Sequence, residues 1–187
     1  CKLVGDVMDK LSRSVREHKG VIVSFMGDGI LAMWNAPQDQ PDHAERAVRA
    51  GHAMIRCLDT VNTTWSGKAG SIKVGVGISS GPAVCGNTGS SVKFQYGPLG
   101  NTVNVASRVE GATKHFGVSM LVTGSTLELL GGKFINRRVR TVRLKGIPED
   151  VTLFEVFENS DAASAASLRD FTEKYERALG HYESSRH

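Results

Sequence analysis

Apolar residues recur at intervals of three and four along several parts of the chain, the spacing that places them on one side of an α-helix. The first such stretch ends in His18-Lys19-Gly20, residues typical of a helix C-terminus. Asp42 is the predicted N-cap of the second helix, and Asn101 or Thr102 that of the third. This spacing predicts helices over 1–19, 42–58, 101–116 and 168–182, and a single helical turn over 126–130.

Shorter apolar runs, bounded by glycine or polar turns, predict β-strands. Two of them flank Gly27-Asp28-Gly29 and predict a hairpin over 21–34. The stretch 71–79 alternates most regularly, and Gly75 and Gly77 on its second face would let another backbone or a ligand approach closely. A second hairpin over 81–86 and 92–96 and single strands over 120–123, 134–144 and 151–157 complete the prediction.

Because several neighbouring strands are joined as hairpins, the sheet is predicted to be mainly antiparallel, with helices on one face. The fold class is therefore α+β and not a doubly wound parallel sheet. With 187 residues in all, the chain is expected to form one globular domain over 1–158. The small, polar stretch 159–167 predicts a linker, and 168–187 predicts a separate amphipathic helical extension.

Composition narrows the classes of function. The net charge of +4 is mild, basic residues near 133–145 alternate with apolar ones, and aromatic residues make up 6% of the chain, so nucleic-acid binding is not expected. No stretch approaches the roughly 20 apolar residues of a membrane span, so membrane contact is expected only through an anchor outside this sequence. The three cysteines, without metal-ligand spacing, predict reduced thiols and a cytoplasmic location.

The stretch from Tyr96 to Arg108 carries the candidate chemistry. Glycine and proline end a strand there, and the helix that follows would place Asn101, Asn104 and Arg108 on one face. An amide and a guanidinium one turn apart suit a ligand with phosphate and hydroxyl oxygens, although for this pair alone a solvated polar face is favoured. Asp28 also has two interpretations: a turn residue, favoured on the hairpin alone, or a metal ligand.

Five segments, in the same order, resemble the catalytic domain of the class III nucleotidyl cyclases, the adenylyl and guanylyl cyclases. The resemblance covers residues 1 to about 158. It implies a ferredoxin-like α/β sandwich that dimerises head to tail, with two active sites formed from residues of both subunits. The segments are Phe25–Trp34, Val74–Gly81, Gly86–Ser90, Tyr96–Arg108 and Val142–Gly146.

The resemblance also implies the chemistry. Two Mg²⁺ or Mn²⁺ ions per site, held by two Asp carboxylates, activate the ribose 3′-oxygen of ATP or GTP for attack on the α-phosphorus, and pyrophosphate leaves. Asp28 matches one metal ligand, Asn104 the residue that orients the ribose, Arg108 the residue that stabilises the transition state, and Lys145 a triphosphate-binding lysine. Asp28 of one protomer is expected to face Asn104 and Arg108 of its partner.

The chain departs from the family pattern at three places. The other metal-binding Asp of the family lies on a first strand ahead of Asp28; nothing from Cys1 onward replaces it, and we expect it on a segment outside this sequence. The two purine-reading positions hold Ser24 and Gly97, which satisfy neither the adenine nor the guanine pattern, so discrimination between the bases is expected to be weak. Lys93 lies near the position of a phosphate-contacting arginine and could substitute for it as a point charge.

Two functions follow from these features. The first is a homodimeric cyclase that acts on ATP, which family prevalence favours, or on GTP. The second is a catalytically silent, cyclase-like module that binds nucleotide or dimerises and regulates a partner. The absent first Asp and the unusual pair Ser24 and Gly97 motivate the second function.

Overall fold

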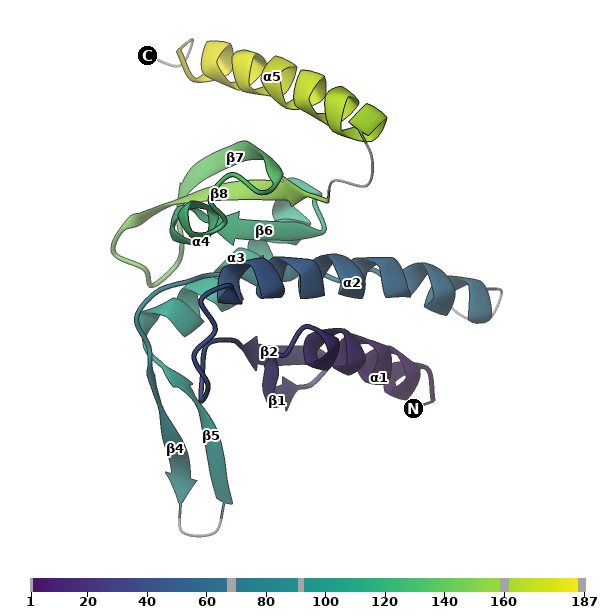
Figure 1. Cartoon of the computed structure of the whole chain (residues 1–187), viewed down its shortest axis with the longest axis vertical. Helices are drawn as coiled ribbons and strands as arrows, with labels where there is room; N and C mark the ends of the chain where they lie inside the picture. Colours follow the sequence, from purple (N-terminus) through teal and green to yellow (C-terminus); the bar gives the residue numbers. More distant parts are fainter. Residues whose placement is uncertain (1, 67–69, 91–92, 159–161, 185–187) are drawn as a thin grey trace.

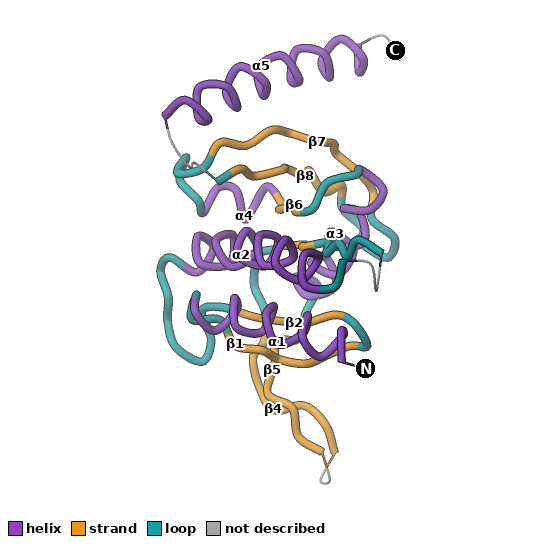
Figure 2. The backbone as a smooth tube through the Cα atoms, turned by 90° about the vertical axis from the view of Figure 1, so that its right-hand side faces the viewer, coloured by secondary structure: helices purple, strands orange, loops and turns teal. Residues whose placement is uncertain are grey.

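The computed structural model describes residues 2–66, 70–90, 93–158 and 162–184. Every predicted helix and hairpin is present, and Figures 1 and 2 show how they are arranged. In chain order the elements are α1 Lys2–Glu17, β1 Val21–Met26, β2 Gly29–Met33, α2 His43–Thr64, β3 Val76–Ile78, β4 Val84–Ser90, β5 Lys93–Leu99, α3 Asn101–Phe116, β6 Met120–Thr123, α4 Gly124–Leu129, β7 Ile135–Arg143, β8 Asp150–Phe157 and α5 Ala162–Ser184.

The central sheet has four strands in the order β3-β6-β8-β7. β3 runs parallel to β6, whereas β8 is antiparallel to both of its neighbours. Among the described residues, β1 pairs with β2 and β4 pairs with β5 as two separate hairpins. The β4–β5 hairpin extends away from the rest of the molecule (Figure 1). The α+β class and the mainly antiparallel pairing are confirmed.

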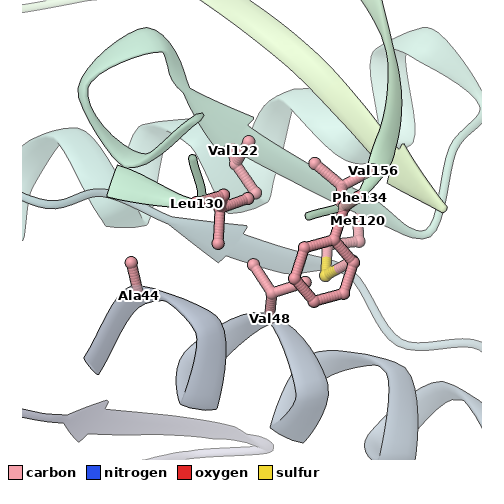
Figure 3. Close-up of a cluster of buried hydrophobic side chains, with 7 residues drawn as sticks. All are labelled: Ala44, Val48, Met120, Val122, Leu130, Phe134 and Val156. Atoms are coloured by element: carbon pink, nitrogen blue, oxygen red, sulfur yellow. The ribbon is translucent and has the colours of Figure 1, made fainter. Parts of the chain in front are cut away.

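Two clusters of buried apolar side chains lie on opposite faces of β6. Met120 and Val122 pack with Ala44 and Val48 of α2 (Figure 3). Leu121, between them in sequence, packs with α3 instead. Because successive strand residues point to opposite faces, α2 and α3 cover different faces of the sheet. The expectation of helices on one face is therefore corrected: both faces of β6 are apolar, and each is covered by a helix.

The predicted strand 71–79 forms only over Val76–Ile78. Its parallel partner β6 provides register partners for these three residues, from Met120 to Val122. Closer to the N-terminus, the Asn62 side chain on α2 accepts from the N–H of Ile72 at 2.8 Å and donates to its carbonyl oxygen at 3.0 Å. Asn62 thus satisfies backbone groups that a neighbouring strand would otherwise pair. Alternation predicts which side chains are buried but does not supply a pairing partner.

Neither predicted N-cap makes the expected bond. Asp42 holds the N-cap position of α2 without a capping bond from its side chain. Arg46 Nε donates to Asp42 Oδ1 at 2.6 Å instead, and this bond lowers the pKa of the carboxyl group. α3 is preceded by Gly100, not capped by Asn101 or Thr102. Thr102 Oγ1 donates to a backbone carbonyl in the loop before β4 at 2.7 Å, which ties the start of α3 to that loop.

The C-terminal helix α5 begins at Ala162, so residues 162–167, predicted to be part of a linker, are helical. Residues 159–161 lie outside the described part of the chain. The physical reason for the difference is the alanine content of the segment, because alanine has the highest helix propensity of all residues.

Helix α5 packs along β7, the edge strand of the sheet (Figures 1 and 2). Arg137 of β7 forms an ion pair with Glu155 at 2.7 Å, and its guanidinium carbon lies 4.1 Å from the ring centroid of Tyr175 on α5. Phe171 of α5 meets Phe157 of β8 edge to face, with ring centroids 6.5 Å apart. Cation–π and aromatic contacts of this kind fix the helix against the sheet.

His52, on α2, is a side chain whose protonation the fold opposes. Its Nε2 has no hydrogen-bond partner in the described structure. Burial, together with the nearby Arg56 and Arg49, lowers the pKa of the imidazole from 6.5 to about 4. Above pH 6.5 the ring is neutral in both the folded and the unfolded chain. Between that pH and about 4 only the unfolded chain takes up the proton, so the free energy of unfolding falls as the pH falls.

Acidification lowers the unfolding free energy of the wild type. We therefore expect it to lower the unfolding free energy of His52→Leu by about 2 kcal/mol less. The measurement is urea unfolding of wild type and variant at a pH above 6.5 and at a pH near 4. His43→Gln is the control, because His43 lies at the start of the same helix and its Nδ1 already has a partner, Gln40 O, at 3.0 Å. Parallel losses in wild type and His52→Leu would contradict the burial of a neutral His52.

Candidate active site

The β1–β2 hairpin presents Asp28 at its tip. Gly27 takes a φ of 64°, a left-handed conformation that glycine adopts without strain, so the turn can be tight. The Asp28 side chain is exposed, and in the described chain it makes no hydrogen bond or ion pair. Its carboxylate is therefore free for a ligand, and carboxylate oxygens are ligands that Mg²⁺ and Mn²⁺ prefer.

Helix α3 carries Asn104 and Arg108 on its exposed face. Val105 and Val109, on the neighbouring face, are buried and pack in the cluster between α3 and the sheet. The spacing of four residues places the two positions on one face of the helix. Neither polar side chain forms a hydrogen bond or ion pair with a described residue. Their donors are therefore held on a fixed helix and remain available to a ligand.

Ser24 and Gly97, the two predicted base-reading positions, lie on strands β1 and β5, which contact each other. Gly97 is buried and Ser24 is half-buried. Val23 makes the close contact: a β-carbon added at Gly97 would lie 2.5 Å from Val23 Cγ1. Both positions therefore belong to one region of one protomer. Sequence reasoning missed Val23, whose only signal is its place next to Ser24.

Lys145 lies in the turn between β7 and β8, where Gly146 takes a φ of 80°. Its neighbours Leu144 and Ile147 are buried and anchor the turn. Lys145 itself is exposed and has no ion pair with any described residue. Lys93 is the first residue of β5, at the outer end of the β4–β5 hairpin, and its side chain lies outside the described structure.

The predicted site residues are not joined to one another by polar contacts within the described chain. No hydrogen bond or ion pair among the described side chains joins Asp28 to Asn104, Arg108 or Lys145. Within the described ranges, no three His, Cys, Asp or Glu residues gather as a group that could hold a metal ion.

A cavity of about 250 Å³, which the sequence did not indicate, lies between β2 and β3. In the described chain β2 pairs only with β1, and β3 only with β6, so each strand has one unpaired edge. Unpaired edges are templates for an additional strand. The predicted site residues Asp28, Asn104, Arg108 and Lys145 do not line the cavity. Its lining includes Leu31, Met33, Ala47, Ile78, Val103 and Ala106.

Comparison with known proteins identifies the family. The family model described as the adenylate and guanylate cyclase catalytic domain matches residues 1–157. The chain belongs to this family. The resemblance to the class III cyclases is thus confirmed, and the matched residues include β1, β2, α3 and the turn with Lys145. Helix α5 lies outside the match.

Relatives of this cyclase domain are longer proteins. Adenylate cyclase 1 of Rhizobium meliloti (strain 1021) is 34% identical over 155 residues, an alignment that covers 82% of this chain and 23% of that protein. The adenylate cyclase of Anabaena cylindrica is 31% identical over 163 residues, covering 83% of this chain and 32% of that protein. The chain therefore spans between about a quarter and a third of the length of these relatives.

Among solved structures, the guanylyl cyclase Cya2 superimposes with a TM-score of 0.75 at 34% identity, covering 83% of this chain and 78% of that one. The two relatives by sequence described above are named adenylate cyclases and this structure is named a guanylyl cyclase, so the names do not indicate which base this domain accepts. None of the described helices has both the length and the apolar character that a membrane crossing requires.

Proposed function

We propose that this cyclase domain converts ATP or GTP into the 3′,5′-cyclic monophosphate and pyrophosphate, at sites shared between the two protomers of a homodimer. The observation that supports this most directly is the pair of Asn104 and Arg108 on α3. Both are exposed and unpaired in the described chain, and the buried side of the same helix holds them in place. Polar groups fixed on a rigid element and left without a partner are pre-positioned for a ligand.

In the proposed reaction the ribose 3′-hydroxyl loses its proton to solvent and its oxygen forms a bond to the α-phosphorus, while the bond from that phosphorus to the bridging oxygen breaks, which releases pyrophosphate. Asn104 binds and orients the ribose. Arg108 donates to the phosphate oxygens, where negative charge increases in the transition state. Lys145 binds the triphosphate, with Lys93 as a second cation, and both act as point charges.

Asp28 is the described residue suited to hold Mg²⁺ or Mn²⁺, because its carboxylate is exposed and unpaired. A divalent ion there supplies charge neutralisation and makes the attacking hydroxyl more acidic. Two ions need a further carboxylate, and the described residues form no group of three acidic, Cys or His side chains. The second Asp of the family pattern belongs, in this proposal, to an additional strand in the cavity between β2 and β3, paired with their free edges.

Large apolar side chains that one protomer leaves exposed support the homodimer. Phe25 and Met26, near the tip of the β1–β2 hairpin, are each 56% exposed. Val84 and Leu99, on the β4–β5 hairpin, are 72% and 52% exposed. Exposed apolar groups of this size mark protein–protein contacts. Because Asp28 follows Met26 closely in the chain, a contact through this hairpin would bring Asp28 to the surface of a second protomer.

Residues 1–158 form the catalytic domain in this proposal, and α5 is an extension that packs on β7. The domain works in the cytoplasm, where nucleoside triphosphates are available, and any membrane attachment comes from a segment outside this sequence.

Product formation tests the proposal. The protein at its natural length is incubated with Mn²⁺ and either ATP or GTP, and cyclic nucleotide is separated by chromatography. The expected result is cyclic product whose rate per protomer rises with protein concentration, because the site needs two protomers. If neither nucleotide yields product at concentrations where the dimer forms, the second candidate gains support: a silent, cyclase-like module that regulates a partner.

A further inference from the structure

Strand β1 carries a β-bulge at Val23. Ile22 has Ala32 and Ser24 has Leu31 as register partners, so the register of the two strands shifts at Val23. A bulge bends its strand and redirects a side chain, and bulges are frequent beside active sites. In this domain the redirected side chain reaches β5.

Val23 meets β5 at Gly97. A β-carbon built at Gly97 would lie 2.5 Å from Val23 Cγ1, much closer than the usual separation of two carbon atoms. Val23 therefore occupies the space into which any side chain at position 97 would extend. Gly86 is the direct partner of Gly97 across the hairpin, and a β-carbon at Gly86 would meet nothing within 4 Å. The close approach is thus specific to Gly97 within this pair.

We propose that Val23 makes base recognition in this cyclase permissive, because it fills the place of a polar base-reading side chain at position 97 and gives the base an apolar wall there. This inference rests on the proposed function, and it takes the region of Ser24 and Gly97, the two predicted base-reading positions, as the base site. Ser24 then offers the side-chain hydroxyl of that region, which can either donate or accept a hydrogen bond. Such a group suits the edge of adenine and of guanine alike.

The expected consequence is weak discrimination between ATP and GTP. A site rejects a wrong ligand strongly when that ligand leaves a buried polar group of the site unpaired. Val23 and Gly97 have no polar side-chain group to leave unpaired. We therefore expect the values of kcat/KM for ATP and GTP to lie within about tenfold of each other. Val23→Thr keeps the branched shape and adds a hydroxyl, and it should shift this ratio at least about fivefold.

The contact itself is tested by substitution on both sides of it. Gly97→Ala drives a methyl group into Val23 and should weaken the binding of fluorescent ATP and GTP analogues alike, by about tenfold or more. Val23→Ala/Gly97→Ala makes room for the methyl and should recover most of the lost affinity, a non-additive result that marks direct contact. Gly86→Ala is the matched control in the same hairpin and should bind both analogues as wild type does.

Cyclic product and analogue binding are measured separately, so that two kinds of failure can be told apart. An active enzyme that prefers one base more than about a hundredfold, or a base ratio that Val23→Thr leaves unchanged, would overturn the role of Val23 and leave the cyclase function intact. Absence of product, with similar binding of both analogues and the expected response of the variants, would overturn catalysis and support the base site. Absence of binding by either analogue would overturn both.

Discussion

A mixture of two inactive variants, Asp28→Ala and Arg108→Ala, is expected to regain about a quarter of the wild-type activity. Each variant removes one side of the proposed shared site, the carboxylate of the hairpin or the guanidinium of α3. In a mixed dimer one site carries both defects, and the other combines an intact hairpin with an intact α3. If protomers exchange freely, about half of the dimers are mixed, and each of those has one working site of two.

Each variant alone should be close to inactive. Arg108→Ala is expected to lower kcat by about 10²–10³, the usual effect of removing one donor that stabilises transition-state charge. Its melting temperature should stay near that of wild type, because Arg108 is exposed and makes no hydrogen bond or ion pair with described residues. A sharply lower melting temperature would make Arg108 a structural residue instead.

The matched control is a mixture of Arg108→Ala with Asn104→Ala. Both residues lie on α3, so in a mixed dimer each site still carries one defect and no activity returns. Dimer formation is checked in parallel by analytical ultracentrifugation. Recovery in this control, or no recovery from the Asp28→Ala and Arg108→Ala mixture although mixed dimers form, would contradict a site divided between the hairpin of one protomer and α3 of the other.

The sequence predicts well those elements that are determined by residues close together in the chain. The third helix lies close to its predicted bounds, although its N-cap is Gly100, because Val105 and Val109 follow helical spacing and Gly117 ends it in the left-handed conformation. The strand over 71–79 is predicted too long because pairing is not local: Ile72 bonds to a side chain on α2, not to a strand. The helical start of α5 was missed because small residues suit both linkers and helices.

For the candidate site, too, motifs within the sequence predict individual residues, whereas contacts between distant strands are seen only in the structure. Ordered motifs predict Asp28, Asn104 and Arg108 as site residues, and the structure adds that all three are exposed and unpaired among the described residues. The sequence could not supply the contact of Val23 with Gly97, because a bulge is a mismatch between two strand registers and no single residue encodes it. The cavity between β2 and β3 depends likewise on strand edges from distant parts of the chain.

Gly77→Ala is expected to unfold the domain, or to lower its free energy of unfolding by about 3 kcal/mol or more. A β-carbon at Gly77 would collide with the backbone nitrogen of Glu110 and lie 2.5 Å from the carbonyl oxygen of Ala106. These are backbone atoms of α3, which cannot rotate away as a flexible side chain could. The sequence pattern predicted a close approach at this glycine, and the backbone of α3 is what approaches. Strand β3 and α3 would have to separate, and α3 carries Asn104 and Arg108.

Gly111→Ala, on α3 itself, is the control with the opposite sign. A β-carbon there would meet nothing within 4 Å, so alanine should stabilise the helix interior by about 0.5–1 kcal/mol. Urea unfolding followed by circular dichroism measures both variants, and an unchanged slope m makes the midpoints comparable. Both substitutions add the same methyl group, so the helix propensity of alanine accounts for the gain at Gly111 and the collision with the backbone of α3 accounts for the loss at Gly77. A loss below about 1 kcal/mol for Gly77→Ala would mean that β3 does not pack directly on the backbone of α3.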